Sequence, residues 1–321
     1  MDAACAARMP HSTVADLVLL EPLHPDAEAL LRAAGTLRTG LDAPVAGAAA
    51  ILTRGLGRIR AETLATAGPG LRCVARVGAG TDNIDVAAAT ARGLPVFYAP
   101  DAFTDSTAEH ALMLLLAVAR RVAPLAAAVR GGHWGARSGP PGLDLGGRRL
   151  GIVGLGRIGR RFGGLAQAVG MDVVAWSRSA RDPRFASVDL DELLATSDVV
   201  SLHLSLDAQT RGFLGAARIA AIKPGAILIN VARGGLVDEA ALATAVADGH
   251  LRGAGLDVLA QEPPPPDHPL FSLPQVLITP HTAALTEGAY RRACLDVAGA
   301  VAGYLRGAPA DPALVRNPEI L

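Results

Sequence analysis

The stretch Arg149-Leu150-Gly151-Ile152-Val153-Gly154-Leu155-Gly156-Arg157-Ile158-Gly159 decides the fold of this 321-residue chain. Its first five residues form a short apolar run, which predicts a buried strand. Three glycines follow with the spacing G-x-G-x-x-G, and a segment rich in Ala, Leu and Arg comes after them. The pattern predicts a strand, a tight turn and a helix in direct succession.

Each glycine of this turn has its own physical task. Gly154 allows the tight turn, Gly156 lets the backbone come close to a ligand, and Gly159 lets the helix pack closely on the strand. The free N–H groups and the dipole of such a helix N-terminus favour an anion, here the pyrophosphate of a dinucleotide. We expect Gly154, Gly156, Arg157, Ile158 and Gly159 to bind this cofactor; the alternative is a glycine-rich turn without a ligand.

The end of the next predicted strand indicates which dinucleotide binds. NAD-selective enzymes usually have Asp or Glu there, against the ribose hydroxyls. In this chain the strand ends at Trp176 and continues with Ser177 and Arg178, so no acid stands at that position. A hydroxyl and a guanidinium suit a 2′-phosphate. We predict NADP as the preferred cofactor, with NAD as the alternative if this loop is only a neutral, solvated one.

Apolar runs alternate with helical patterns along the chain, which predicts an α/β fold built from βαβ units. Residues 103–285 are expected to form the dinucleotide-binding domain, a doubly wound parallel Rossmann sheet of six or seven strands. Residues 1–102 and 286–321 are expected to form a smaller, flavodoxin-like parallel-sheet domain for the substrate. The predicted strands are Asp16–Leu20, Ala49–Thr53, Leu71–Val77, Pro95–Tyr98, Arg149–Val153, Asp172–Trp176, Asp198–Leu204, Ala226–Val231, Gly253–Val258 and Val276–Thr279.

The composition argues against several classes of protein. There are 30 Lys and Arg against 30 Asp and Glu, and this balance gives no long-range attraction to nucleic acid or an anionic membrane. The apolar stretch from Ala111 to Ala119 is far shorter than the ~20 residues that span a bilayer. Cys5, Cys73 and Cys294 are scattered, which argues against a disulfide framework or a metal site. We expect a cytoplasmic protein without a bound metal.

Ionisable residues near the carboxyl ends of the predicted strands are the candidate catalytic groups, because ligands of open parallel sheets bind beyond these ends. His203, Arg233, Asp257 and His281 each close or follow a strand, and Glu262 comes soon after Asp257. Each alone could be structural, but together they can bring a guanidinium, a carboxylate and an imidazole to one rim. The remaining histidines are expected on helices or loops away from it: His11, His24, His110, His133, His250 and His268.

These groups suit hydride chemistry on a 2-oxo acid, which needs a hydride at the carbonyl carbon and a proton at its oxygen. The donor fork of Arg233 can hold the substrate carboxylate and polarise the carbonyl. His281 can supply the proton, and a neighbouring Glu262 carboxylate would favour its imidazolium form. A nicotinamide would carry the hydride.

Several ordered motifs resemble those of the D-isomer-specific 2-hydroxyacid dehydrogenases, and the resemblance covers nearly the whole chain. Several motifs at matching spacing are far more specific than any one of them. The matching segments are Val77–Asp85, Ala108–His110, the nucleotide fingerprint Gly151–Gly159, the arginine motif Asn230–Asp238, the glutamate motif Gly255–Pro263 and the histidine motif Thr279–His281.

The resemblance implies a role for each matching residue. It implies that Arg233, Glu262 and His281 form a catalytic triad. It also implies that the backbone at Ala79 and Gly80 receives the substrate carboxylate, which agrees with a glycine-rich concavity of N–H groups. A homodimer is implied through the long helix predicted from residue 104 to about residue 122, the alternative being internal packing only. Further residues implied at the cofactor site are Thr107, His203, Thr210, Ala232 and Asp257.

The chain departs from the family pattern at three positions. Ser177 and Arg178 stand where the family usually has an Asp or Glu for the ribose hydroxyls. Ser205 stands where the family commonly has proline in the loop of His203. Glu262 is present where the formate branch has a different residue, which favours proton-coupled chemistry over formate oxidation. The resemblance therefore implies an NAD(P)-dependent reductase of the glyoxylate/hydroxypyruvate kind.

Two alternatives stay open. One is a short 3-phosphoglycerate dehydrogenase, whose phosphate Arg54 could bind; because the chain ends at Leu321 without a regulatory domain, we do not expect the long allosteric enzymes. The other is a dinucleotide-sensing transcriptional corepressor on the same fold, since such proteins can keep the triad. The pocket for the substrate side chain is expected near Arg54–Leu56, Ala102–Phe103 and Leu285.

Overall fold

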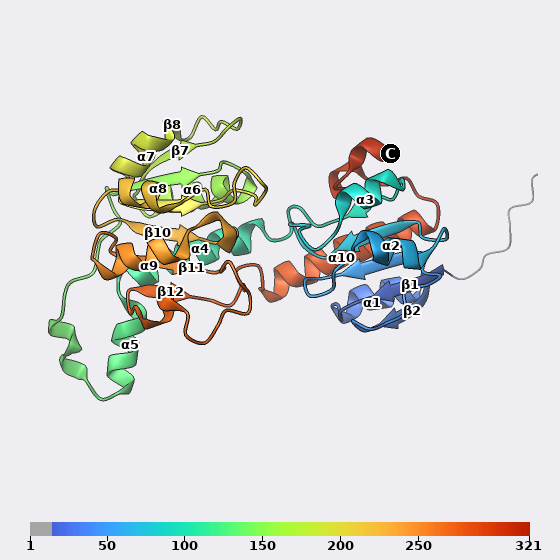
Figure 1. Ribbon diagram of the computed structural model, residues 1–321, viewed down its shortest axis with the longest axis horizontal. Coiled ribbons are helices and arrows are strands. Elements are labelled where there is room, and N and C mark those ends of the chain that lie inside the picture. Colours follow the sequence, from blue (N-terminus) through green and yellow to red (C-terminus); the bar gives the residue numbers. More distant parts are fainter. Residues whose placement is uncertain (1–14) are drawn as a thin grey trace, which may run out of the picture. The chain divides into compact units, whose positions relative to one another are not determined.

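The computed structural model describes residues 15–321, and the chain divides into two compact units (Figure 1). Unit 1 combines Met1–Phe103 with Glu287–Leu321, and unit 2 is Thr104–Thr286. Each unit has its own parallel sheet. Cys5 and His11 lie outside the described residues.

Unit 2 is built around seven parallel strands in the order β12-β11-β10-β9-β6-β7-β8. The order reverses at β6, because β7 and β8 lie on one side of it and the later strands on the other. The expected doubly wound Rossmann sheet is therefore confirmed. Its strands are β6 (Arg149–Val153), β7 (Asp172–Trp176), β8 (Ala186–Ser187), β9 (Val199–Leu202), β10 (Ile227–Asn230), β11 (Gly253–Leu256) and β12 (Val276–Ile278).

Apolar side chains cover both faces of this sheet, which explains why its strands are nearly continuous apolar runs. Leu114 of α4 and Phe162 of α6 belong to one buried cluster, and Leu193 of α7 and Leu242 of α9 belong to another. The helices of unit 2 are α4 (Thr104–Ala119), α5 (Val122–Arg130), α6 (Arg157–Ala168), α7 (Leu190–Thr196), α8 (Ala216–Ala221), α9 (Glu239–Ala247) and the 3-10 helices η1 (Trp134–Ser138), η2 (Gly234–Leu236) and η3 (Pro269–Ser272).

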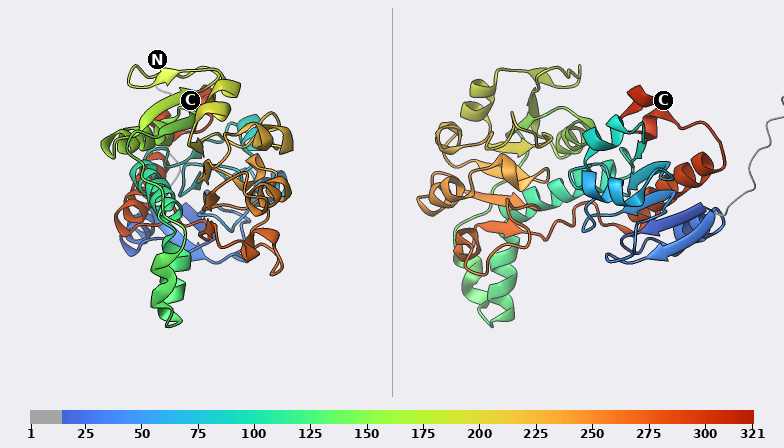
Figure 2. Two further views of the ribbon diagram at one scale, coloured as in Figure 1. Left: turned by 90° about the vertical axis from the view of Figure 1, so that its left-hand side faces the viewer. Right: turned by 45° about the vertical axis from the view of Figure 1, so that its right-hand side comes forward.

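The long helix α4 is shorter than predicted. It ends at Ala119, and Arg121 takes a left-handed φ of 55°, after which α5 runs at 63° to α4. The sequence does carry a signal for this break, because Pro124 lies three residues beyond Arg121 and would disrupt the interior of one continuous helix. Figure 2 shows α5 projecting from the rest of its unit. Among residues 15–321 no single helix is long and apolar enough to cross a membrane, although the bent pair α4 and α5 together meets that test by length and composition.

Unit 1 holds five parallel strands in the flavodoxin-like order β2-β1-β3-β4-β5, which reverses between β1 and β3. Strand β2 was not predicted, because its sequence Gly-Thr-Leu-Arg-Thr has no apolar run. The tail helix α10 packs against α1 and β4. The elements are β1 (Ala15–Leu19), β2 (Gly35–Thr39), β3 (Ala50–Thr53), β4 (Cys73–Arg76), β5 (Val96–Phe97), α1 (Pro25–Arg32), α2 (Ala61–Ala67), α3 (Val86–Ala91), α10 (Glu287–Leu305) and the 3-10 helices η4 (Pro312–Leu314) and η5 (Pro318–Ile320).

Candidate active site

The glycine turn after β6 is closed at its two ends and open in the middle. Gly154 has a φ of 101°, and a Cβ on it would lie 2.7 Å from the carbonyl oxygen of His203. A Cβ on Gly159 would lie 2.3 Å from the carbonyl oxygen of Gly154. A Cβ on Gly156, the N-cap of α6, would meet no atom of residues 15–321 within 4 Å apart from its chain neighbours. The middle of the turn is therefore free to receive a ligand at the N-terminus of α6.

His203 borders this turn with its backbone, while its ring is turned into the unit. The imidazole packs on Phe162 with ring centroids 5.4 Å apart, and its Nε2 lies 2.9 Å from Ser201 Oγ. Burial lowers the pKa of His203 to about 3, so the ring is neutral. The expected contact of His203 with a cofactor stays a prediction.

Arginines surround the loop that begins after β7. Arg178 Nη1 donates a hydrogen bond to Gln209 Oε1 at 2.6 Å. Arg181 Nη1 donates to the carbonyl of Ser177 at 2.8 Å, and Arg160 Nη2 donates to the carbonyl of Arg181 at 3.2 Å. No Asp or Glu stands directly after β7 to bind the ribose hydroxyls of NAD, and the loop there carries a hydroxyl and several guanidinium groups instead.

Arg233 follows β10 and is positioned by its own loop. Asn230 Nδ2 donates to the carbonyl of Arg233 at 2.9 Å, and Arg233 Nη1 donates to the carbonyl of Ala232 at 2.7 Å. A Cβ on the next residue, Gly234, would lie 1.9 Å from the carbonyl carbon of Leu259. Only glycine permits this approach, which brings the arginine loop against the loop that follows β11.

Glu262 and His281 form a hydrogen-bonded pair. Glu262 Oε2 lies 2.7 Å from His281 Nδ1, and the two side chains are 38% and 46% exposed. Burial raises the pKa of Glu262, but the hydrogen bonds from His281 and from the N–H of Leu259, with the charges of His281 and Arg233, hold it below its usual value. Because His281 Nδ1 is engaged with Glu262, its Nε2 is the nitrogen available to exchange a proton with a ligand.

The buried carboxylate of Asp257 holds the loop that carries His281. Asp257 is 1% exposed and accepts hydrogen bonds from Thr279 Oγ1 at 2.6 Å, Thr282 N at 2.9 Å and Ala283 N at 2.8 Å. The N–H of His281 donates to the carbonyl of Asp257 at 2.8 Å. His281 has a φ of 55°, which is unfavourable for a residue with a Cβ. The hydrogen bonds around Asp257 therefore stabilise a strained backbone at the imidazole.

Two histidines that the sequence places on helices or loops make side-chain contacts within unit 2, and one of them contacts Asp257. His110 Nε2, on α4, lies 3.4 Å from Asp257 Oδ1 and 2.9 Å from Thr279 Oγ1. His268 Nε2 lies 3.1 Å from Glu239 Oε2 at the start of α9. Both contacts join segments distant in sequence, so the strand pattern alone could not show them.

The other cofactor-site residues implied by the resemblance also belong to unit 2. Thr107 is buried on α4, and Ala232 adjoins Arg233. Thr210 is buried, and its Oγ1 donates to the carbonyl of Ser205 at 2.7 Å. The contacts of these three residues with a cofactor stay predictions.

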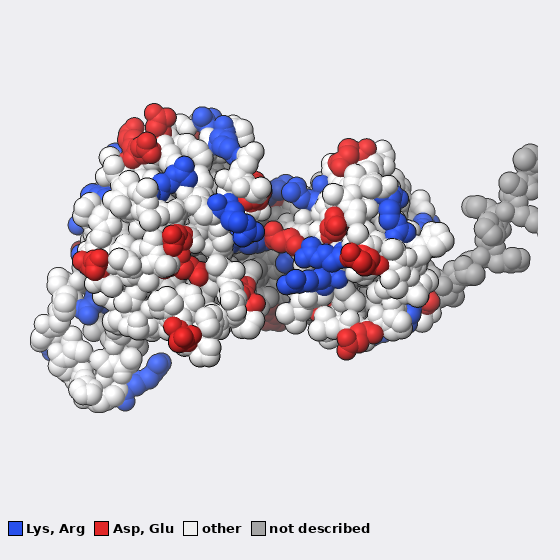
Figure 3. Space-filling model, in the orientation of Figure 1, with Lys and Arg blue, Asp and Glu red and all other residues white. Residues whose placement is uncertain are grey.

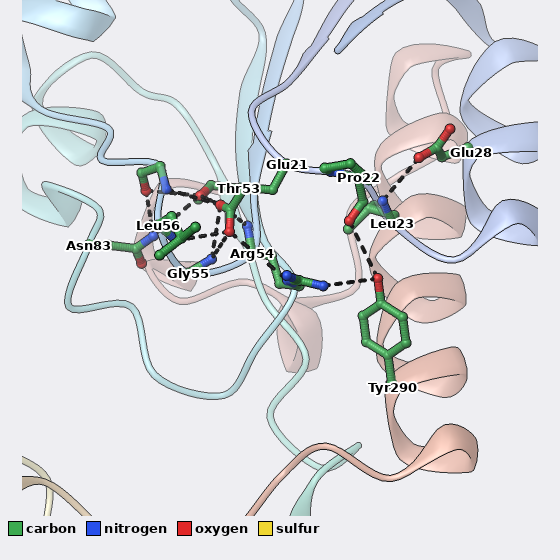
Figure 4. Close-up of polar contacts among 11 residues, drawn as sticks. Glu21, Pro22, Leu23, Glu28, Thr53, Arg54, Gly55, Leu56, Asn83 and Tyr290 are labelled. Atoms are coloured by element: carbon green, nitrogen blue, oxygen red, sulfur yellow. Dashed lines mark hydrogen bonds and ion pairs between the residues drawn. The ribbon is translucent and has the colours of Figure 1, made fainter. Parts of the chain in front are cut away.

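In unit 1 a second buried carboxylate organises the loop after β3 (Figure 4). Glu21, just beyond β1, is 4% exposed. It accepts a 2.8 Å hydrogen bond from Thr53 Oγ1 and bonds of 2.9–3.0 Å from the backbone N–H groups of residues 54–57. Asn83, after β4, donates from Nδ2 to the carbonyl of Gly57 at 2.7 Å. The role of Glu21 was not predicted, because its only signal in the sequence is a single acid directly after an apolar strand.

Arg54, the predicted substrate residue, lies on this loop between Glu21 and Tyr290 (Figure 4). Its Nη1 lies 3.4 Å from Tyr290 Oη, its guanidinium carbon is 5.7 Å from the centre of the Tyr290 ring, and its Nε is 4.0 Å from Glu21 Oε1. The side chain is still 42% exposed. The guanidinium is therefore oriented but open to solvent.

The backbone predicted to bind a carboxylate, at Ala79 and Gly80, follows β4. Arg76 Nη1 donates to the carbonyl of Gly80. Among the hydrogen bonds of residues 15–321, the N–H groups of Ala79 and Gly80 have no acceptor. These two groups can donate to an anion, and that role stays a prediction.

No group of three or more His, Cys, Asp and Glu side chains within residues 15–321 is arranged to hold a metal ion. Figure 3 shows both acidic and basic side chains on each unit, in line with the balanced charge.

The Glu21 network makes unit 1 sensitive to acid. Burial raises the pKa of Glu21, but the hydrogen bonds from Leu56, Gly57, Gly55 and Thr53 together lower it from 4.5 to about 2. A carboxylate whose pKa is lowered by folding stabilises the folded state at pH values above its pKa in the unfolded chain. This contribution is lost as the pH falls toward 2.

We expect Glu21 to contribute about 3 kcal/mol that disappears between pH 5 and pH 2. Urea unfolding of the wild type and of Glu21→Gln at several pH values measures it. The variant is expected to be less stable at pH 7 and to show a flatter decline in acid. Parallel curves for the two proteins would contradict this assignment.

Comparisons with known proteins agree with this geometry. Residues 112–283 match the family model described as D-isomer specific 2-hydroxyacid dehydrogenase, NAD binding domain. The chain is 46% identical over 278 residues to a D-3-phosphoglycerate dehydrogenase of Mycobacterium leprae, covering 85% of this chain and 52% of that protein. It is 41% identical to a glyoxylate reductase of Korarchaeum cryptofilum, covering 75% of each.

A crystal structure of a Thermus thermophilus protein superposes with a TM-score of 0.87 and 39% identity, covering 94% of this chain and 99% of that one. The chain spans about half the length of the phosphoglycerate dehydrogenase it matches. The matched family model covers most of unit 2, including the glycine turn, Arg233, Glu262 and His281, so a nicotinamide dinucleotide is the cofactor of this unit. The chain belongs to the D-isomer specific 2-hydroxyacid dehydrogenase family.

Proposed function

We propose that this chain reduces small 2-oxo acids to D-2-hydroxy acids, with glyoxylate and hydroxypyruvate as substrates. The Glu262–His281 pair carries the proposal. It combines an imidazole with a carboxylate 2.7 Å away, and the charge of Arg233 acts on the same carboxylate. Reduction of a carbonyl requires a positioned proton donor of this kind.

The turn after β6 fits the dinucleotide, since the space beside Gly156 is open and the turn leads into the N-terminus of α6. The N–H groups there would hold the pyrophosphate. Thr107, Thr210, Ala232 and Asp257 are proposed to line the rest of the cofactor site. When bound, the nicotinamide supplies the hydride.

The chain's own residues would then bind and protonate the substrate. Arg233 holds the substrate carboxylate with its N–H donors and polarises the carbonyl. His281 gives a proton from Nε2 to the carbonyl oxygen as that oxygen gains charge, and Glu262 stabilises the imidazolium before transfer. In unit 1, the N–H groups of Ala79 and Gly80 are proposed to donate to a substrate carboxylate.

Replacing His281 with Ala is expected to lower kcat by about 10²–10⁴-fold, because it removes the proton donor. Binding of NADPH, measured by fluorescence titration, should be unaffected. Glu262→Gln keeps a hydrogen-bonding side chain without the charge and should lose less activity than His281→Ala. Full activity of His281→Ala would defeat the mechanism.

Oxidation of 3-phosphoglycerate is the second candidate, since the Mycobacterium leprae relative carries the name of that activity and Arg54 offers an exposed guanidinium. An NADPH-oxidation screen with glyoxylate, hydroxypyruvate, pyruvate, phenylpyruvate and phosphohydroxypyruvate separates the candidates. Highest kcat/KM for phosphohydroxypyruvate would favour the second. No turnover with tight NADPH binding would favour a dinucleotide-sensing corepressor.

We propose NADP as the preferred cofactor, because Ser177, Arg178, Arg181 and Arg160 surround the loop after β7. kcat/KM is expected to be higher with NADPH than with NADH. Arg178→Ala should lower the value for NADPH by about tenfold, equivalent to about 1.4 kcal/mol, and change the value for NADH little. A tenfold preference of the wild type for NADH would rule out this choice.

Two glycine variants separate packing of the turn from binding. Gly156→Ala adds a Cβ in open space at an ordinary φ of −77°, so stability should be kept while the Kd of NADPH rises about tenfold. Gly159→Ala pushes a methyl group against the Gly154 carbonyl and should cost about 1–3 kcal/mol of stability. Thermal melts and NADPH titrations measure both. Equal losses of stability would contradict this division.

A homodimer is proposed through α4 and α5. None of the residues of α5 is buried, and apolar side chains are exposed along this part of the chain, which is typical of a protein interface. Sedimentation equilibrium tests it, with a mass of twice 32.7 kDa expected. The exposed apolar residues are Met113, Leu116, Val122, Val129 and Trp134.

A further inference from the structure

The carboxylate of Glu21 lies where the order of the unit 1 strands reverses. Glu21 follows β1, and the loop that it binds follows β3, the two strands between which the order turns back. In open α/β sheets, ligands bind beyond the carboxyl ends of the strands at this point. The loop of residues 53–57 is therefore at the ligand-binding edge of unit 1.

The carboxylate of Glu21 points toward the backbone of this loop, which supplies hydrogen-bond donors to it (Figure 4). Four successive N–H groups and one hydroxyl converge on two oxygens. Converging donors of this number specify one loop conformation, because a loop in any other conformation would leave a buried charge unpaired. The carboxylate has little exposed surface for contact with a ligand, whereas the residue Leu56 is 73% exposed and the side chain of Arg54 is 42% exposed.

We propose that Glu21 is a positioning residue, which holds residues 53–57 in the conformation that binds the 2-oxo acid without touching the substrate itself. This inference rests on the proposed function. Part of the substrate affinity would then depend on the Glu21 carboxylate, which binds the loop backbone and not the substrate. Asn83, which donates to the carbonyl of Gly57, extends the same support to the loop after β4. The ionised state needed for this role is kept at neutral pH, since hydrogen bonds lower the pKa of Glu21 to about 2.

The experiment compares Glu21→Gln and Glu21→Asp with a matched control, Glu28→Gln. Glu28 also accepts a backbone hydrogen bond, from Leu23 N at 3.0 Å, but makes no hydrogen bond to residues 53–57. Steady-state kinetics are measured with the best 2-oxo acid of the screen, and hydrogen exchange of the amides of residues 54–57 is followed in the same proteins. NADPH affinity shows that the rest of each variant is intact.

In Glu21→Gln we expect KM for the 2-oxo acid to rise about tenfold with kcat nearly unchanged, because binding is lost equally in ground and transition states. The loop amides should exchange faster, Glu21→Asp should recover part of the affinity, and Glu28→Gln should behave like the wild type. If Glu21→Gln does not fold, the smaller change in Glu21→Asp must still raise KM.

When the wild type is active, two results would overturn the inference. Faster exchange of the loop amides with an unchanged KM would mean that Glu21 holds a loop that does not bind substrate. A kcat that falls with KM unchanged would mean that the residue acts elsewhere. Absence of turnover by the wild type is seen before any variant is compared; it would refute the proposed function, and the inference with it.

Discussion

A carboxylate that is buried at the end of a strand must be surrounded by hydrogen-bond donors, because an unpaired charge away from water is strongly destabilising. Both units of this chain meet that requirement with loop backbone. Asp257 collects two N–H groups and a hydroxyl from residues 279–283, and Glu21 collects four N–H groups and a hydroxyl from residues 53–57. In each case the donors belong to a loop at the carboxyl edge of its sheet, where ligands of parallel sheets bind.

The support in unit 2 has a direct chemical consequence. His281 takes a left-handed φ, a conformation that a residue with a Cβ adopts only when its surroundings enforce it. The loop around Asp257 enforces it, and the imidazole reaches Glu262 at 2.7 Å. Gly234 adds the other half of the arrangement, since the absent Cβ lets the loop of Arg233 approach Leu259. Packing of the backbone thus decides how close the guanidinium, the carboxylate and the imidazole come.

The strand pattern predicted the fold well because parallel strands covered on both faces are almost purely apolar. Each predicted strand is present to within two residues at each end. The pattern missed β8, which has only two residues, and the edge strand β2, whose residues pair with β1 without an apolar run. Helix α5 was also missed, although α4 ends within three residues of its predicted end and Pro124 separates the two helices in the sequence.

The sequence by itself determined the glycine turn and the doubly wound sheet, and it indicated Arg233, Glu262 and His281 as candidate catalytic residues, because these follow from local spacing and from the shared edge of parallel strands. Only the tertiary structure decided that His110 contacts Asp257, that His268 contacts Glu239 and that Glu21 binds the backbone of residues 54–57. Those contacts join segments distant in the chain, and a single charged residue carries no sign of which donors the fold will bring to it.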